Sequence, residues 1–185
     1  MKVLFITEND PIYIYDFFKE LIENHDKNKF ELVGVTILNA FNESLIKTCI
    51  RLLKLYNIDF HKILFKYISV KFKKQDITNL LRKNDYKIIS TKSVNSDEYL
   101  KKIKKLDLDL IISVASPEIF RSNLINIPKI CALNIHNGKI PDYRGMLPSF
   151  WQMNNEEKNI TITIHKIVEK LDSGDILKTN LFPIQ

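Results

Sequence analysis

Three polar side chains in the last third of the chain, Asn134, His136 and Asp172, are of the types that carry out chemistry at a carbonyl group. A side-chain amide and a protonated imidazole can both donate a hydrogen bond to an oxygen on which negative charge develops. A carboxylate beside an imidazole favours its charged form and can help to move a proton. Together the three side chains would suit attack of a nucleophile on a carbonyl carbon.

A strand and a turn must position this trio. The apolar run 132–136 predicts a short strand, on which Asn134 and His136 leave the same face side by side. Asp172 follows the β-branched run 160–168 in a tight turn. Taken singly, such residues are more often a structural histidine, a turn-forming aspartate and a backbone cap. Their joint occurrence in a spaced pattern favours the catalytic interpretation.

Two neighbours of the trio are interpreted as structural. His165 lies on the later strand, and we assign it a packing role. Asp175 is expected to bond turn amides close to Asp172. A helix is predicted to begin near Pro148, because proline suits the first turn of a helix. Trp151 within it is interpreted as a core or cleft-wall residue.

The first half of the chain predicts a strand, a helix and a second strand over residues 2–7, 15–23 and 30–38. This order is typical of a βαβ unit with a parallel sheet. Further strands are predicted at residues 86–91 and 108–114. Between them Asn95, with Glu98 three residues on, predicts a capping box at a helix start, and Ser116 with Pro117 predicts another helix.

These elements predict one compact α/β domain over residues 1–185, a Rossmann-like open, mostly parallel sheet with helices on both faces. In such sheets ligands bind beyond the carboxyl ends of the strands. The chain has four glycines and neither a dinucleotide-binding nor a P-loop glycine motif, so those chemistries are not expected. No metal site is predicted.

Cysteine usage and hydropathy point to a reducing compartment. Cys49 and Cys131 lack the spacing of a disulfide framework and are interpreted as free thiols. Acidic residues follow the first apolar run too soon for a signal peptide, and no uncharged run reaches membrane-spanning length. We expect a cytoplasmic protein.

The net charge of +6, from 28 basic and 22 acidic residues, is concentrated in residues 47–105. This basic half would attract a nucleotide, a tRNA or an anionic membrane surface, or it is simply a solvated lysine face. Within it, residues 45–74 carry apolar side chains at helical spacing between lysines. Two interpretations stay open for them: a core-packed helix with an extension, or an amphipathic patch on a membrane surface.

The segments 134–141, 143–145, 163–165 and 171–176 together resemble the formyltransferase family that uses 10-formyltetrahydrofolate. Its members act on glycinamide ribonucleotide, methionyl-tRNA or nucleotide-linked sugars. The family signature is an Asn-x-His pair, a loop closing in Leu-Pro and a later Leu-Asp-x-Gly turn. This chain departs from it at Asn137-Gly138, where the family has Pro-Ser or Gly-Ser, and at Ile140, where leucine is usual.

The resemblance implies roles for particular residues. Asn134 and His136 would hold the oxyanion of formyl transfer, and Asp172 would support the imidazole and the proton transfer. The pterin of the folate would lie between the loop with Ser116 and Pro117 and the turn with Glu169 and Lys170, with Phe120 against it. Tentative substrate contacts complete the prediction: Asn9, Asp10, Tyr13 and Arg144.

The acceptor implied by the resemblance is a small-molecule amine, in particular the amino group of a nucleotide-linked sugar. This follows from residues 146–151 and 163–165, which look most like the sugar-modifying members. A nucleic-acid partner is not expected, since no tRNA-binding domain follows residue 185 in this sequence. Methionyl-tRNA formylation, hydrolysis of the formyl folate, and a non-catalytic folate or sugar-phosphate binding domain stay open. A homodimer is also left open.

Overall fold

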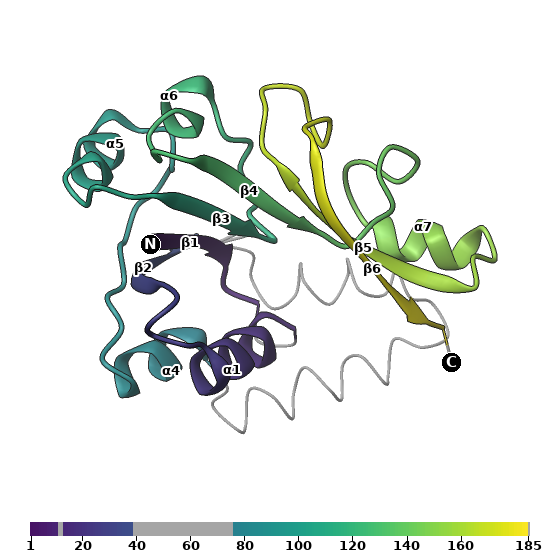
Figure 1. The fold of residues 1–185 in the computed structure, drawn as a ribbon, viewed down its shortest axis with the longest axis horizontal. Helices are drawn as coiled ribbons and strands as arrows, with labels where there is room; N and C mark the ends of the chain where they lie inside the picture. Colours follow the sequence, from purple (N-terminus) through teal and green to yellow (C-terminus); the bar gives the residue numbers. More distant parts are fainter. Residues whose placement is uncertain (11–12, 39–75, 185) are drawn as a thin grey trace, which may run out of the picture.

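The computed structural model describes residues 1–10, 13–38 and 76–184 (Figure 1). Six strands within these residues form one sheet in the order β2-β1-β3-β4-β5-β6. The sheet has a parallel half and an antiparallel half, which meet where β4 pairs with β5. The polar residues predicted to be catalytic lie at this junction.

The parallel half is the predicted βαβ arrangement. Its strands are β1 (Lys2–Glu8), β2 (Glu31–Leu38), β3 (Leu110–Val114) and β4 (Cys131–His136). All three pairings between them are parallel. Their carboxyl ends therefore share one edge, as the sequence predicts.

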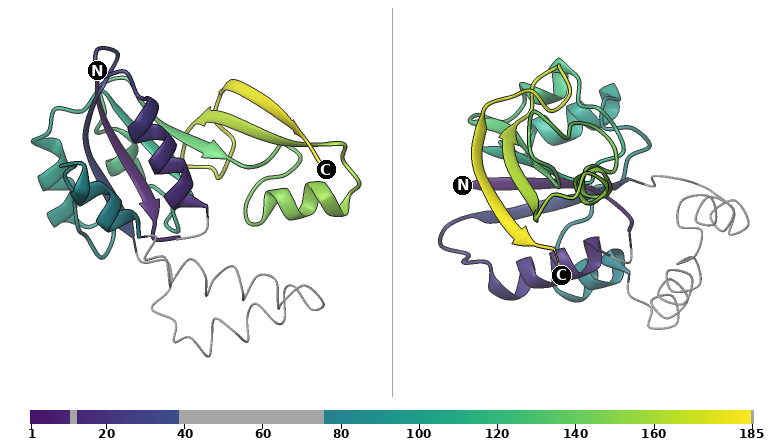
Figure 2. Two further views of the ribbon diagram at one scale, coloured as in Figure 1. Left: turned by 90° about the horizontal axis from the view of Figure 1, so that it is seen from below. Right: turned by 90° about the vertical axis from the view of Figure 1, so that its right-hand side faces the viewer.

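The antiparallel half begins with β5 (Asn159–Lys166), which reverses direction against β4 and pairs with the edge strand β6 (Ile176–Pro183). Helix α7 (Pro148–Asn154) begins with the expected proline and lies beside this hairpin (Figure 2). The buried Gln152 fastens the helix, because it donates to the carbonyl of Asn137 and accepts from the amide of Thr161.

Helices cover both faces of the parallel half, which confirms the predicted fold class. On one face α1 (Ile14–Asn24) and α4 (Ile77–Lys83) pack Phe18 and Leu81 against Phe5. On the other face α5 (Asp97–Lys104) and α6 (Ser122–Ile125) pack Ile103 and Leu124 against Ile6. Burial of these apolar side chains on both faces is the main contribution to the stability of the sheet.

Two predicted elements are wrong. Residues 86–91 form no strand: Lys87 and Ile89 exchange hydrogen bonds with Val35 alone, and Ile88 makes an isolated bridge. The helix predicted at Ser116 begins only at Ser122. The reason is competition from the tertiary structure, because the Glu118 carboxylate accepts from Ser93 Oγ and the Val94 amide.

The cap of α5 is Ser96 rather than Asn95. Its hydroxyl accepts from the amide of Tyr99. Asn95 instead contacts the loop before α6, where it accepts from the Arg121 amide and donates to the Ile119 carbonyl. The local sequence pattern thus predicted where the helix begins, but it could not predict the distant residues to which Asn95 bonds.

Residues 45–74 and Cys49 lie outside the described residues, so both interpretations of that segment stay predictions. Cys131 is a free thiol. In the part of the chain that the structure describes, every helix is too short or too polar to cross a membrane.

Candidate active site

The trio predicted from sequence converges at the junction of the two half-sheets. Asn134 and His136 lie on β4, and the turn after β5 brings Asp172 to them. Asn134 Nδ2 lies 3.4 Å from Asp172 Oδ1, and His136 Nδ1 lies 3.7 Å from Asp172 Oδ2. The His136 and Asp172 residues are 7% and 8% exposed, so water screens their interaction little.

The Asp172 carboxylate is held by its neighbours on both sides. The amide of Gly145 donates to its Oδ2 at 2.9 Å, and His165 Nε2 lies 3.5 Å from its Oδ1. The residue itself has a φ of 44°, a left-handed conformation that aspartate tolerates better than most residues. The backbone conformation at Asp172 therefore serves to present the carboxylate to β4.

Burial by itself would raise the pKa of Asp172, but the surrounding donors outweigh it. The contact with His165, the Gly145 amide and the charges of His136 and His165 together hold the pKa of Asp172 below its usual 3.8. The carboxylate is consequently ionised at neutral pH and is available to accept a proton.

This lowered pKa predicts how stability depends on pH. Ionised Asp172 stabilises the fold above its ordinary pKa of 3.8, and this contribution disappears as the pH falls through the lower pKa of the folded state. We expect Asp172→Asn to unfold more easily than wild type at pH 7, with the difference narrowing at pH 3 and below. Urea unfolding at both pH values measures it, and a difference that does not change with pH would contradict the prediction.

The His136 ring is fixed by the loop that follows β4. Its Nε2 lies 2.7 Å from the carbonyl oxygen of Tyr143, so this nitrogen must carry a proton and donate. Nδ1 is then the nitrogen that faces Asp172, at a distance longer than a hydrogen bond. A proton on Nδ1 is available to Asp172 or to a substrate oxygen.

Gly138 lies directly against the bond that fixes the imidazole. A Cβ at this position would lie 2.8 Å from His136 Nε2 and 2.7 Å from the Tyr143 carbonyl oxygen. Any side chain would therefore disturb the bond that fixes the imidazole. The carbonyls of Asn137 and Gly138 are held in turn by Ser149 and Thr163.

His165 was predicted to be structural, and the structure places it inside the cluster. It pairs with Asn134 across β4 and β5, is 2% exposed, and lies 3.3 Å from Asn134 Nδ2 through its Nε2. The sequence contains a signal for this placement of His165. The residue lies seven positions before Asp172, on the strand that must bring Asp172 to β4. Asp175 is exposed and pairs with Lys166 at 3.0 Å, a surface interaction rather than a bond to turn amides.

Arg144, predicted to contact substrate, is tied to the same turn. Its Nε donates to the main-chain oxygen of Asp172 at 2.9 Å. Gly174 on the other side of the turn approaches the Lys166 carbonyl so closely that a Cβ would lie 2.0 Å from that oxygen. The Asp172 turn is thus packed against both β5 and the loop after β4.

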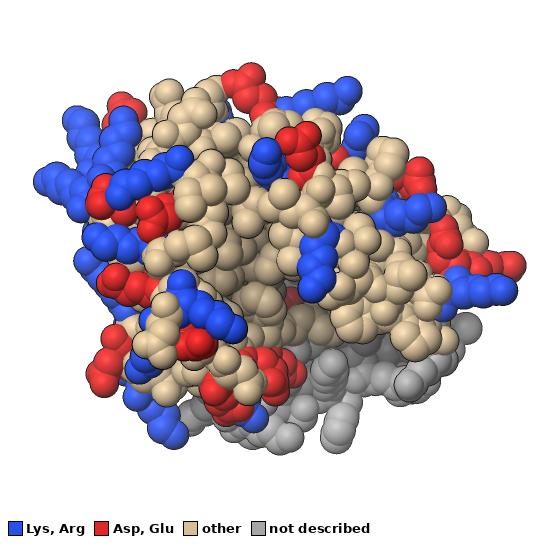
Figure 3. Space-filling view, in the orientation of Figure 1, with Lys and Arg blue, Asp and Glu red and all other residues tan. Residues whose placement is uncertain are grey.

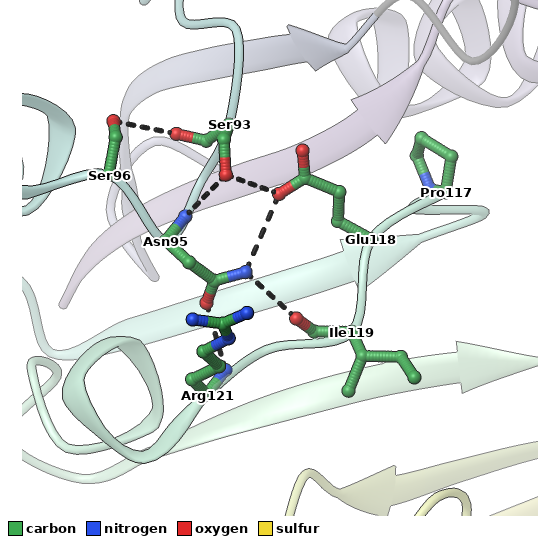
Figure 4. Close-up of a pocket in the computed structure, with 7 residues that line it drawn as sticks. All are labelled: Ser93, Asn95, Ser96, Pro117, Glu118, Ile119 and Arg121. Carbon is green, nitrogen blue, oxygen red and sulfur yellow. Dashed lines mark hydrogen bonds between the residues drawn. The ribbon is translucent and has the colours of Figure 1, made fainter.

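A pocket of about 630 Å³ lies near the edge of the sheet that carries the trio. None of the three trio residues lines this pocket (Figure 4). Pro117, Glu118 and Ile119 form one wall, and Ser93 and Asn95 the other. Asn95 holds the two walls together through its bonds to Ile119 and Arg121. Of the residues predicted to bind folate, Pro117 lines this pocket.

The other predicted folate contacts are divided. Ser122 donates to the Glu169 carboxylate, which joins the start of α6, just after the loop that follows β3, to the turn before Asp172. Ser116 bonds within its own loop, and Lys170 is exposed and accepts from Ser173 through its carbonyl. Phe120 is 4% exposed and packs in the core, so its ring is not presented to the pocket.

Asn9, Asp10 and Tyr13 lie at the carboxyl end of β1 and the start of α1. Strand β3 separates β1 from the strand with the trio. Asp10 Oδ1 accepts from the Tyr13 amide, and the Tyr13 side chain is 68% exposed. Their role as substrate contacts stays a prediction.

Two further features of the described residues, the basic side chains on the surface and the potential metal ligands, contribute little to the site. Basic side chains gather over α5, away from the tan centre of the face in Figure 3; they include Lys101, Lys102 and Lys104. Among the residues with described positions, no group of three or more His, Cys, Asp or Glu side chains could hold a metal ion.

Comparison with known sequences gives a family match. The model of the family described as formyl transferase matches residues 60–185. The methionyl-tRNA formyltransferase of Pediococcus pentosaceus is 34% identical over 102 residues, which are 55% of this chain and 32% of that protein. The chain therefore spans about a third of the length of this relative.

Solved structures match the whole chain at lower identity. A sugar N-formyltransferase from Shewanella sp FDAARGOS_354 superposes with a TM-score of 0.58 and 21% identity, covering 100% of this chain and 58% of that one. A formyltetrahydrofolate deformylase from Pseudomonas syringae pv. tomato superposes with a TM-score of 0.63 and 13% identity, covering 100% and 51%. At these identities the likeness concerns the fold.

Proposed function

The chain belongs to the formyl transferase family, and on that premise we propose that it transfers a formyl group from 10-formyltetrahydrofolate to the amino group of a nucleotide-linked sugar. The observation that supports this most directly is the convergence of Asn134, His136 and Asp172 from two separate segments onto one buried cluster. An amide, an imidazole and an ionised carboxylate are the groups that formyl transfer to an amine requires.

Each member of the trio has a part in the proposed reaction. The folate supplies a formyl carbon bonded to nitrogen, and the acceptor amine attacks this carbon. The bond between the formyl carbon and the folate nitrogen then breaks, that nitrogen takes up the proton given up by the amine, and tetrahydrofolate leaves. Asn134 Nδ2 and a proton on His136 Nδ1 provide hydrogen bonds to the formyl oxygen as negative charge develops on it. Asp172 faces His136 Nδ1 and helps to remove the proton that the amine loses. The bond to the Tyr143 carbonyl keeps the ring oriented throughout.

We propose that the folate binds between the loop after β3 and the turn before Asp172. The contact between Ser122 and Glu169 brings these two segments together. Pro117 lines a pocket whose walls Asn95 fastens to each other. Ser116, Pro117, Glu169 and Lys170 would hold the pterin largely through backbone groups, while Phe120 supports the loop from the core.

The exposed residues that follow the loop after β4 in the sequence support a sugar nucleotide as the acceptor. Trp151 is 50% exposed, which rules out a position in the core and leaves the cleft wall as a prediction, and its ring meets that of Phe150 edge to face at 5.2 Å. Met146 and Leu147 are also exposed and follow directly on Gly145, which donates to Asp172. Exposed aromatic rings of this kind bind sugars and bases by stacking. Homodimer formation and a membrane contact through residues 45–74 stay predictions.

A formyl-transfer assay tests the proposal. The protein is incubated with 10-formyltetrahydrofolate and a panel of nucleotide-linked amino sugars, beside methionyl-tRNA and a reaction without acceptor. We expect formylated sugar from at least one member of the panel and no formate release without acceptor. Formylated methionyl-tRNA, or formate in the reaction without acceptor, would overturn the sugar assignment in favour of a tRNA formyltransferase or a hydrolase.

A further inference from the structure

His165 is a buried titratable group that the reaction outlined above does not use. Its ring lies 6.2 Å from that of His136, centre to centre, and its residue is 2% exposed. A buried imidazole needs partners for both nitrogens, because an unpaired buried polar atom is costly. The partners of one of these nitrogens, Asn134 and Asp172, belong to the proposed catalytic trio.

The two nitrogens of His165 have different tasks. Nδ1 lies 2.8 Å from the carbonyl oxygen of Lys166, so it carries a proton and donates. Nε2 faces Asn134 Nδ2 at 3.3 Å and Asp172 Oδ1 at 3.5 Å. In a neutral ring Nε2 accepts from the Asn134 amide, and in a charged ring it donates to the Asp172 carboxylate.

We propose that His165 is a positioning residue for formyl transfer: its Nε2 atom holds the Asn134 amide when the ring is neutral or the Asp172 carboxylate when the ring is charged, and the Asn134 amide itself donates to Asp172. This inference rests on the proposed function and assigns a role beyond the trio. With His136 on Oδ2 and His165 on Oδ1, each carboxylate oxygen of Asp172 faces one imidazole. The amide and the carboxylate then have little freedom to turn before substrate arrives, as a preorganised site requires.

Two substitutions separate this role from a merely structural one. In His165→Gln the side-chain amide reaches the position of Nε2 and can serve Asn134 or Asp172. In His165→Asn the shorter amide reaches only the position of Nδ1 and can keep the bond to the Lys166 carbonyl. A structural role predicts that His165→Asn is the better tolerated variant, and a positioning role predicts the reverse.

We expect His165→Gln to keep kcat within about threefold of wild type and His165→Asn to lose roughly 10- to 100-fold, as is usual for residues that orient a catalytic group. Affinity for the folate should change little in either variant, and circular dichroism establishes that both fold. Equal kcat values in the two variants, or a larger loss in His165→Gln, would overturn the proposal.

A second measurement keeps the test independent of turnover. The carboxyl carbon of Asp172 is titrated by NMR, with the signal assigned by its loss in Asp172→Asn. The groups that face this carboxylate are Asn134 and His136 from β4, His165 from β5 and the Gly145 amide. The pKa of Asp172 should rise toward 3.8 in His165→Asn and stay low in His165→Gln. If wild type shows no formyl transfer, the proposed function fails, while this titration still decides whether His165 acts on Asp172.

Discussion

Asp172→Asn should lower kcat by about 1,000-fold with little change in folate affinity, which is the largest effect we expect of any single substitution. The substitution keeps the shape of the side chain but removes the charge that faces both His136 and His165. It also removes the acceptor for a proton from the attacking amine. Steady-state formyl transfer, beside folate binding by calorimetry, measures both quantities.

Asp175→Asn is the matched control, since this aspartate lies in the same turn region and pairs only with the partly exposed Lys166. Exposed ion pairs of this kind contribute little to stability. We expect the control variant to behave as wild type in both assays. A loss in Asp175→Asn as large as that in Asp172→Asn would mean that the turn, and not the buried carboxylate, determines the rate.

His136→Ala should lower kcat by roughly 100- to 1,000-fold, because it removes the donor that we place on the formyl oxygen. The Tyr143 carbonyl loses its partner as well, so the loop after β4 should become less ordered. Gly138 packs against this bond, so a side chain at that position could not take the place of the imidazole without moving the loop. Transfer kinetics measure the first effect, and thermal unfolding measures the second.

His25→Ala serves as its control. His25 follows α1 and packs on Phe30 and Tyr86, on the face of the sheet covered by α1 and α4. Its loss should leave kcat unchanged for the folded protein. If His136→Ala retains full activity in the same assay, the imidazole is not part of the reaction and the oxyanion must be held by other donors.

The structure alters the sequence-based predictions for the acceptor side of the site more than those for the trio. Arg144 was predicted to contact substrate, yet its Nε bonds the backbone of Asp172 and so helps to hold the catalytic turn. Trp151 was expected in the core or a cleft wall and is half exposed. Long side chains near a site reach either the substrate or the scaffold, and sequence spacing alone does not distinguish the two.

The sequence by itself determined the order of strands and helices, the face shared by Asn134 and His136, and the likeness of four separated segments to one family. Those features depend on local period and turn chemistry, which neighbouring residues largely fix. The helix expected at Ser116 and the strand expected at 86–91 failed because bonds to Glu118 and Val35 from distant segments prevailed over local preference.

Only the tertiary structure decided which groups surround the carboxylate. His165 lies 31 residues from Asn134 in the chain, and the antiparallel register of β4 and β5 alone brings their side chains together. The same register, with the turn pinned by Gly145 and Gly174, brings Asp172 between two imidazoles. A pairing register is set by the packing of the whole sheet, so no local reading of the residues could supply it.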